Sequence, residues 1–482
     1  MKKITTIAIM GIFLVLFVSG CASENSQTDS GNYDWSNFDV NSSHLTTESV
    51  SESLRLPELT ENSGLPDYLA YAALNNPGLE AAFNRWKAAL DRVPQVKALP
   101  DPRFTYRYFI EEVETRVGPQ RQGFEISQLF PWFGKLELRG DIAGQAANVA
   151  RQRYEAAKLK LFFEVKDAYY EYYYLAKSIA VTKENVSLIK HLESVAQSRY
   201  KAAAGTHPDV IRAQVEMGKL EDRYRTQLDL QQPIVARLNA ALNRPVEATI
   251  PWPTEIQFND IVVIDQELLA RLVVENPELK ALDFEITQNK KSIELAKKDY
   301  YPDFTLGLGI IDTGDAIAGN PQDNGKNPVI AMVSVNIPLW QKKYSAGVRE
   351  ARSRYLAARG ERTEKANSLS STLKMALYRF RDSERKIDLY RDALLPKAEE
   401  SLKVTESGFR TGTATFTDLI DAQRILLEFA LSFERALADR SQSLAKLEML
   451  VGQQLPQKEN ETGEPDAIND APDKENLRLE QK

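Results

Sequence analysis

The chain has 482 residues, of which 61 are Lys or Arg and 68 are Asp or Glu, so its formal net charge is −7. A mildly acidic balance spread along the chain argues against a nucleic-acid-binding protein, and a single cysteine excludes intrachain disulfides and cysteine-rich metal sites. The length exceeds the roughly 250 to 300 residues at which one core stops growing, so more than one structural unit is expected.

The first 20 residues have the layout of a secretory signal peptide. Two lysines precede the apolar run Ile4–Val18, which is shorter than the roughly 20 residues that span a bilayer. The run leads into Val18-Ser19-Gly20-Cys21, which resembles a bacterial lipobox. We therefore predict a lipoprotein signal peptide over 1–20 and a lipidated, palmitate-bearing Cys21; the alternative is an ordinary signal peptide with an incidental cysteine. No aspartate follows Cys21, so the outer membrane is the expected destination.

Composition separates a structured part from two polar ends. Residues 21–65 are rich in Ser, Thr, Asn, Asp and Glu and are predicted to form a lipidated N-terminal tether. Residues 453–482 are rich in Asp and Glu, contain three prolines and are predicted to form a disordered acidic tail. The structured part is then expected over 66–452.

The structured part contains one pattern twice, which indicates an internal duplication. Asn76-Pro77-Gly78-Leu79 recurs as Asn276-Pro277-Glu278-Leu279, Phe130-Pro131-Trp132-Phe133 as Ile337-Pro338-Leu339-Trp340, and Asp209-Val210-Ile211-Arg212-Ala213-Gln214 as Asp418-Leu419-Ile420-Asp421-Ala422-Gln423. These motifs predict a first repeat over 66–244, a proline-containing linker over 245–264 and a second repeat over 265–452.

Each repeat is predicted as a helix, two strands, a very long helix, a tight turn and another helix. The long helices are expected over 134–203 and 342–410, and their apolar residues recur every seven positions, which is typical of coiled-coil packing. This spacing is shown by Val165, Tyr172, Ile179 and Val186, and by Leu373, Phe380, Ile387 and Leu394. The shorter helices, expected over 66–98 with 208–244 and over 265–300 with 415–451, would match the long ones when stacked end to end.

Four segments between the helices alternate between apolar side chains and polar or small ones. Their apolar positions include Phe104, Tyr106, Tyr108 and Ile110; Phe124 and Ile126; Phe304, Leu306, Leu308 and Ile310; and Val329, Ala331, Val333, Val335 and Ile337. This pattern is typical of membrane β-barrel strands, although soluble hairpins share it. The neighbouring lipid anchor and the polar loops near 112–122 and 312–327 favour the membrane.

Four strands cannot close a barrel, and an open sheet edge is not tolerated in lipid. Three copies of four strands would give twelve strands in a closed ring, with the helices as twelve rods. A membrane-spanning chain of this kind is therefore expected to be a homotrimer.

At this point the sequence resembles the TolC family of outer-membrane efflux proteins over 66–452. The resemblance rests on the paired Asn-Pro openings, on Gln128-Leu129-Phe130-Pro131, and above all on the segment from Phe409 to Arg424. It implies a mainly helical fold with a membrane β-barrel portion, in which the trimer forms a 12-stranded barrel on an α-helical coiled-coil tunnel in the periplasm. It also implies a periplasmic adaptor protein and an inner-membrane pump, of the RND type, as partners, and outer-membrane lipid around the barrel. Phe130–Lys135 is reminiscent of the CzcC-like branch.

The turns between the helices are expected at the periplasmic mouth, where they would contact the adaptor. These tip residues are Gly205, Thr206, His207 and Pro208 in the first repeat and Thr411, Gly412 and Thr413 in the second. We expect His207 to be a turn residue rather than a metal ligand.

Acidic residues follow these turns. Asp418 and Asp421 are three positions apart on one helix face, so a trimer would place six carboxylates around the axis as a cation-favouring gate. The alternative is that they only complement the helix dipole. Asp209 is the first-repeat equivalent. Some family members close the mouth with a tyrosine and an arginine, but Phe409 and Ala414 stand there and cannot donate those bonds.

No nucleophile and base pair, phosphate loop or carboxylate dyad is present, so the sequence predicts no enzyme, no cofactor and no metal site. We predict a passive duct that exports small solutes, metal ions or drugs, for an inner-membrane pump. The alternatives are a non-conducting periplasmic coiled-coil scaffold lipoprotein and the outer-membrane duct of a type I protein secretion system.

Overall fold

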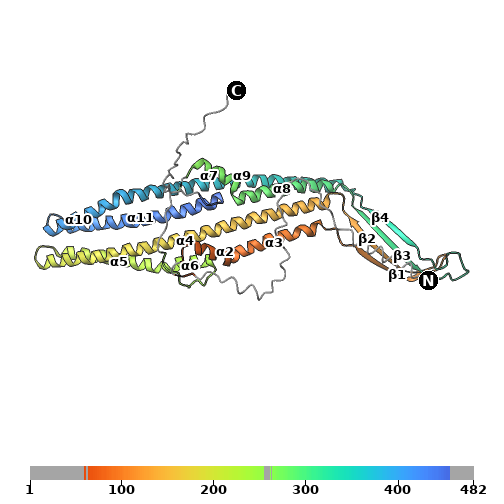
Figure 1. The fold of residues 1–482 in the computed structure, drawn as a ribbon, viewed down its shortest axis with the longest axis horizontal. Coiled ribbons are helices and arrows are strands. Elements are labelled where there is room, and N and C mark those ends of the chain that lie inside the picture. The colour runs from red at the N-terminus through yellow and green to blue at the C-terminus, as the bar shows by residue number, and fades with distance from the viewer. Residues whose placement is uncertain (1–58, 61–62, 254–260, 262, 456–482) are drawn as a thin grey trace, which may run out of the picture. The chain divides into compact units, whose positions relative to one another are not determined.

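The structure is a computed structural model that describes residues 59–60, 63–253, 261 and 263–455. Its elements form two successive series of the same kind (Figure 1). The first contains α2 (Leu65–Asn75), α3 (Pro77–Lys97), β1 (Arg103–Val113), β2 (Gln120–Phe130), α4 (Lys135–Lys201), α5 (His207–Asp229) and α6 (Gln231–Leu242). The second contains α7 (Asp265–Glu275), α8 (Pro277–Lys298), β3 (Phe304–Thr313), β4 (Val329–Val335), α9 (Gln341–Leu389), the π-helix η2 (Tyr390–Leu394), α10 (Leu395–Thr411) and α11 (Phe416–Val451). None of the helices in these described ranges is both long and apolar enough to cross a membrane.

The first long helix, α4, runs without a break for 67 residues. The seven-residue row forms the packing surface that the sequence predicts, because Val165 and Tyr172 are fully buried. Thr182 and Ile189, which are seven positions apart in a second row, are fully buried too. One core joins α4 to α2 and α6, and another joins its far end to α5 and α11. The coiled-coil prediction for this helix is confirmed.

The second long helix runs from Gln341 to Thr411, close to the predicted 342–410, but one of its turns is π-helical rather than α-helical. The π-helix η2 separates α9 from α10, and Pro396 lies in the first turn of α10. Proline has no N–H to donate and its ring crowds the carbonyl one turn earlier, so a regular α-helix cannot continue through this point. Leu373 and Phe380 are fully buried, but Leu394 falls in the π-turn and is only partly buried.

The expected short helices over 66–98 and 265–300 are also each broken, at Asn76 and Asn276. Both asparagines adopt an extended backbone conformation and cap the following helix, which starts with a proline. The side chain of Asn76 donates to the carbonyl of Ala241 at 3.0 Å, and that of Asn276 donates to the carbonyl of Leu450 at 2.8 Å. Each asparagine therefore joins the start of one short helix to the end of another, while α2 packs beside α6.

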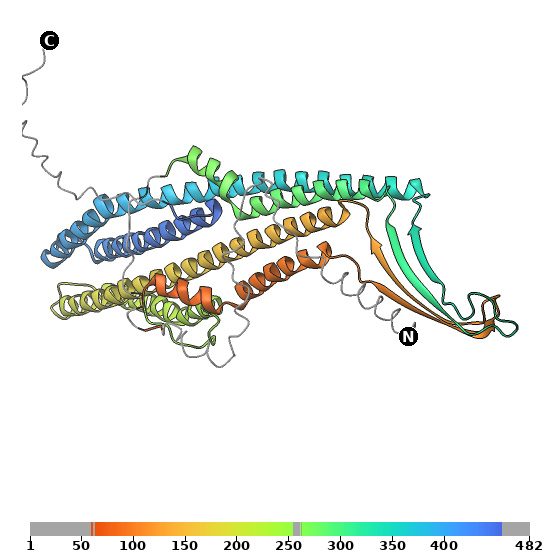
Figure 2. The same ribbon diagram turned by 45° about the vertical axis from the view of Figure 1, so that its right-hand side comes forward.

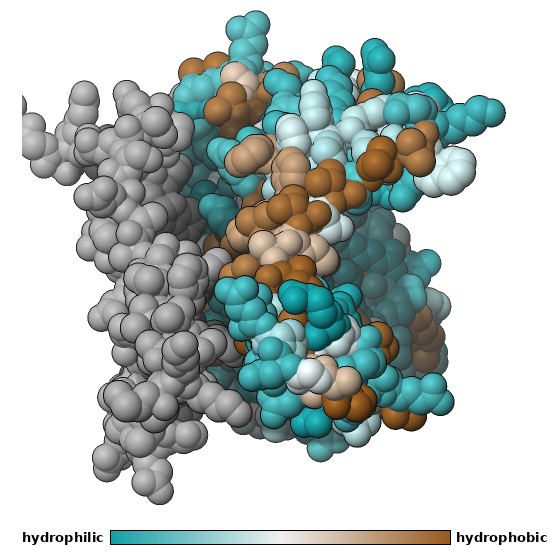
Figure 3. Space-filling model, turned by 90° about the vertical axis from the view of Figure 1, so that its right-hand side faces the viewer, coloured by the Kyte–Doolittle hydropathy of each residue, from teal (hydrophilic) through white to brown (hydrophobic). Residues whose placement is uncertain are grey.

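The four strands form one antiparallel sheet in the order β1-β2-β3-β4. The register pairs Phe104 with Ile126, Ile126 with Leu308 and Leu308 with Ala331, so these apolar side chains share one face. Glu125 lies on the other face, where it forms an ion pair with Arg107. The alternation in the sequence therefore does separate an apolar face from a polar one. Seen from the strand end, hydrophobic residues gather in a group bordered by hydrophilic ones (Figure 3).

The start of the expected linker packs against the first repeat. Ile250 is buried, and its carbonyl accepts a hydrogen bond of 2.9 Å from the Tyr172 hydroxyl. Trp252 stacks on the Tyr172 ring with centroids 4.5 Å apart. Residues 245–253 are therefore part of the folded first repeat, while 254–260 and 262 lie outside the described residues.

Candidate functional site

The sheet lies at one end of the long helices, and the turns after α4 and α10 lie at the other (Figures 1 and 2). Ala203 and Gly412 adopt left-handed backbone conformations, with φ of 59° and 85°, which reverse the chain at these turns. Thr206 and Thr415 then cap α5 and α11. The tip residues predicted from the sequence therefore belong to two matching turns at the end of the helices away from the sheet.

The aspartates Asp209 and Asp418 occupy equivalent capping positions. Asp209 accepts hydrogen bonds from the backbone and hydroxyl of Thr206 at 3.2 and 2.7 Å, and Asp418 accepts the same bonds from Thr415 at 2.8 and 2.7 Å. These bonds hold the pKa of Asp418 below its usual range, so its carboxylate stays ionised. Both carboxylates are engaged at the starts of their own helices, as in a capping box.

Asp421 is the freer of the two predicted gate residues. Its side chain is 57% exposed and forms one ion pair, with Arg424 at 3.2 Å on the same helix. On the first repeat the equivalent position is Arg212, whose guanidinium donates to the hydroxyl of Thr417 on α11. Arginines thus stand beside the acidic residues of this end and offset part of their charge.

Phe409 does not face solvent. It is 4% exposed, its ring packs against Phe416 with centroids 5.4 Å apart, and the Arg199 guanidinium lies 4.6 Å from its ring centroid. We therefore correct its assignment as a gate residue: its side chain is part of the core that joins the two helical hairpins. Ala414, the other expected latch position, lies in the turn before α11.

Two arginines tie the hairpin of α4 and α5 to the hairpin of α10 and α11. Arg199 donates to the backbone carbonyls of Phe409 and Arg410, the latter at 3.2 Å. Arg424 forms a two-pronged contact with the buried Glu216, at 3.1 Å from Nε and 2.5 Å from Nη2. The bond from Arg424 holds the pKa of Glu216 below its ordinary value.

No local pattern in the sequence singles out Arg199 or Glu216 as residues that tie the hairpins together. The one available signal was the pair of missing donors at Phe409 and Ala414, which indicates that other residues join the hairpins.

Most of the remaining tip residues are exposed. His207 lies against the Tyr200 ring with centroids 5.3 Å apart, and Pro208 occupies the first turn of α5. Thr411 and Thr413 both donate to the carbonyl of Gly408. Within the described ranges no group of three or more His, Cys, Asp or Glu side chains could hold a metal ion. Cys21 lies outside the described residues.

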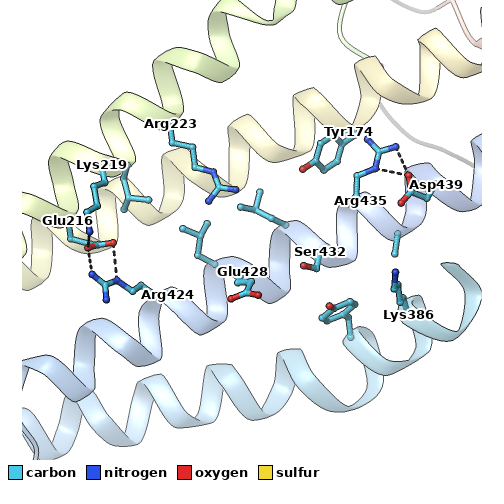
Figure 4. A pocket seen from close by; sticks show the side chains of 15 residues that line it. Tyr174, Glu216, Lys219, Arg223, Lys386, Arg424, Glu428, Ser432, Arg435 and Asp439 are labelled. Carbon is cyan, nitrogen blue, oxygen red and sulfur yellow. Dashed lines mark hydrogen bonds and ion pairs between the residues drawn. The ribbon is translucent and has the colours of Figure 1, made fainter. Parts of the chain in front are cut away.

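A cleft of about 620 Å³ opens between the two hairpins, further from the turns (Figure 4). Charged side chains from α5, α9 and α11 line it, and Tyr174 of α4 and Tyr390 of η2 complete the wall. Ion pairs hold several of these charges, including Arg435 with Asp439 at 2.6 Å.

Two repeats that build long helical hairpins and share a four-stranded sheet with one apolar face define a protein of the outer-membrane channel class. A family model described as outer membrane efflux protein matches residues 69–244 and 268–453. The chain belongs to this family, and the resemblance to TolC-family proteins and the mainly helical TolC-like fold are confirmed. Membership places it in a family of efflux channels rather than in a family of enzymes.

Individual relatives are distant in sequence but similar in fold. The cobalt-zinc-cadmium resistance protein CzcC of Cupriavidus metallidurans is 22% identical over 403 residues, which cover 80% of this chain and 88% of that protein. The solved structure of the outer membrane protein VceC from Vibrio cholerae has a TM-score of 0.67 at 16% identity and covers 81% of this chain and 96% of that chain. The CmeC outer membrane channel of Campylobacter jejuni has a TM-score of 0.66 at 14% identity, with 91% and 96% covered.

Proposed function

We propose that the chain is the outer-membrane channel component of a tripartite efflux system, a passive trimeric duct without enzymatic activity. A signal peptide over 1–20 is removed, Cys21 carries the lipid and 21–65 form the tether. The repeats over 66–244 and 265–452, joined by 245–264, build the duct, and 453–482 form an acidic tail. An inner-membrane pump of the RND type and a periplasmic adaptor deliver small solutes, metal ions or drugs.

The observation that carries this proposal is the sheet. Its apolar face includes Phe104, which is 66% exposed, and Val333, which is 70% exposed. Within the described residues β1 and β4 each have one unpaired edge. Backbone groups in lipid must be paired within the protein, so both the apolar face and the open edges are explained if further copies continue the sheet into a closed barrel.

At the opposite end we propose that the turns form the periplasmic mouth and contact the adaptor. Asp421 is the acidic residue of this gate that does not cap a helix, whereas Asp418 and Asp209 do. Their charge would favour cations in a narrow opening. Because Asp418 and Asp209 also cap helices, Asp421 is the position at which charge can be changed with least effect on folding.

The duct is tested by recording single channels from the lipidated protein, purified in detergent, in planar bilayers, with its mass measured in parallel. We expect a trimer that gives discrete conductance steps. A folded monomer that never conducts would instead support the scaffold lipoprotein.

The gate is tested with Asp421→Asn, which removes the charge and keeps the size of the side chain. We expect a lower ratio of potassium to chloride permeability, from reversal potentials in a salt gradient. The matched control is Asp222→Asn on α5, an exposed aspartate away from the turns. Equal ratios in both variants would remove Asp421 from the gate and leave the duct in place.

A further inference from the structure

Some of the charged side chains that line the cleft between the hairpins form no ion pair that the described structure shows. Its two ends are closed by ion pairs: Arg424 with Glu216 at 2.5 Å toward the turns, and Arg435 with Asp439 at 2.6 Å at the other end. Arg435 also binds Glu171 of α4 at 2.8 Å. The groups that remain open to a ligand lie between these pairs (Figure 4).

The lining of the cleft includes five cationic and three anionic side chains. Arg223 on α5 and Glu428 on α11 both line it, and neither forms a hydrogen bond or ion pair that the structure shows among the described residues. Lys219 lies one turn before Arg223 and shares the already paired Glu216 at 3.5 Å. Lys386 is held by Asp382 at 2.7 Å. Among the charged side chains that line the cleft, Arg223 is therefore the cation and Glu428 the carboxylate for which the described structure shows no ion pair.

The neutral groups around Arg223 can also donate hydrogen bonds. Tyr174 of α4 presents its ring and hydroxyl to the cleft, and Ser432 of α11 adds a second hydroxyl. With the Arg223 guanidinium and the Lys219 ammonium, the lining therefore offers two cationic groups and two hydroxyls as donors. A planar guanidinium with neighbouring donors matches the geometry of a carboxylate or phosphate group.

The cleft lies on the same face of α11 as the predicted gate. Asp421, Arg424, Glu428, Ser432, Arg435 and Asp439 are spaced three or four positions apart and so follow one face of the helix. If Asp421 faces the axis of the duct, the cleft opens onto the same passage. This step rests on the proposed function.

We propose that the cleft is an anion-binding recess in the duct wall, formed around the Arg223 guanidinium, which receives carboxylate or phosphate groups of passing solutes. In a trimer three such recesses stand behind the acidic mouth. The passage then has two zones of opposite sign: the mouth favours cations, and the recesses give anionic groups a place to bind beyond it.

Binding is measured first, by isothermal titration of the detergent-purified full-length protein with inorganic phosphate at low salt. We expect Arg223→Gln to weaken binding about three- to tenfold, because a charge-assisted contact in a partly exposed cleft is lost. Glu428→Gln should strengthen binding, since it removes the opposing charge. Arg225→Gln is the matched control, because it removes the same charge from α5 at an exposed position that does not line the cleft.

Conduction is measured second, with the same variants in planar bilayers. Arg223→Gln should raise the ratio of potassium to chloride permeability, and Glu428→Gln should lower it, while Arg225→Gln leaves it near the wild-type value. Phosphate binding that is equal in Arg223→Gln and Arg225→Gln overturns the recess, and so does weaker binding in Glu428→Gln. A protein that binds phosphate through Arg223 but never conducts retains the recess and contradicts the duct.

Discussion

The two repeats use one pattern but differ in the regularity of their long helices. In the first repeat, α4 runs for 67 residues with no proline in its sequence. In the second, 49 residues of α9 are followed by a five-residue π-helix and then by α10, which contains Pro396. The same seven-residue spacing therefore gives a regular α-helix in one repeat and a long helix with one π-turn in the other.

The comparison shows where each repeat gains its rigidity. In the first, Tyr172 is fully buried, stacks on Trp252 and binds the carbonyl of Ile250. In the second, the part of the long helix after the π-turn buries only Ala398 and Phe409. The first repeat is thus fixed by its own core, whereas α10 packs on α11 and is tied to the other hairpin by Arg199.

The largest expected effect concerns the start of the two long helices. Lys135 is 3% exposed and binds Asp303 at 2.9 Å across the repeats, whereas Lys342, at the matching position, is exposed. Breaking a buried ion pair costs about 3–5 kcal/mol, so Lys135→Met should lower the thermal midpoint strongly. Circular dichroism of the purified protein measures this. If Lys342→Met lowers the thermal midpoint as much as Lys135→Met does, the buried ion pair of Lys135 is not the cause of the loss.

A smaller difference in stability is expected between substitutions of Asn76 and Asn276, the residues that connect the short helices. Asn276 is 2% exposed and makes three hydrogen bonds, at 2.8, 2.9 and 3.2 Å, whereas Asn76 is only partly buried and makes two. We expect Asn276→Ala to cost about 2–3 kcal/mol of stability and Asn76→Ala about 1 kcal/mol. Denaturant unfolding of both variants measures the two free-energy changes. A larger loss in Asn76→Ala than in Asn276→Ala would show that burial of the asparagine does not decide the loss of stability.

The tie between Glu216 and Arg424 should respond to pH. The bond lowers the pKa of Glu216 from its ordinary value of 4.5, so its stabilising effect is complete above that pH and is lost as the pH falls through the lowered value. The second-repeat position that matches Glu216 is Ile425, which has no charge to lose.

We therefore expect Glu216→Gln to remove part of the loss of stability that occurs as the pH falls below 4.5, the ordinary pKa of this carboxyl. Thermal unfolding at a series of pH values measures it. An unchanged pH dependence in Glu216→Gln would show that other carboxylates carry the transition.

The smallest effect on stability is expected at the π-turn in the second long helix. Pro396→Ala restores a backbone donor, so the π-turn should relax toward an α-helix with a change of about 0.5–1 kcal/mol. Hydrogen exchange of the amides of Tyr390–Leu394 should slow. Unchanged exchange rates would show that the π-helical hydrogen bonding of this turn does not depend on Pro396.

Much of this architecture follows from local patterns. Seven-residue apolar spacing predicts the long helices and alternation predicts the strands, because burial on one face imposes a period of its own on each kind of element. The repeated turn motifs likewise predict where the hairpins reverse. The sequence predicts Asp209, Asp418 and Asp421 as the acidic residues after the turns. Asp209 bonds to Thr206 and Asp418 to Thr415, so Asp421 is the one that does not cap a helix.

The sequence by itself determined the elements, their order, the duplication and the two-faced strands, because these depend on the spacing of neighbouring side chains. Only the tertiary structure decided that Phe409 is buried, that Arg424 reaches Glu216 and that Arg223 faces a cleft. These contacts join residues about 200 positions apart, and their formation depends on how the two hairpins pack rather than on any local preference.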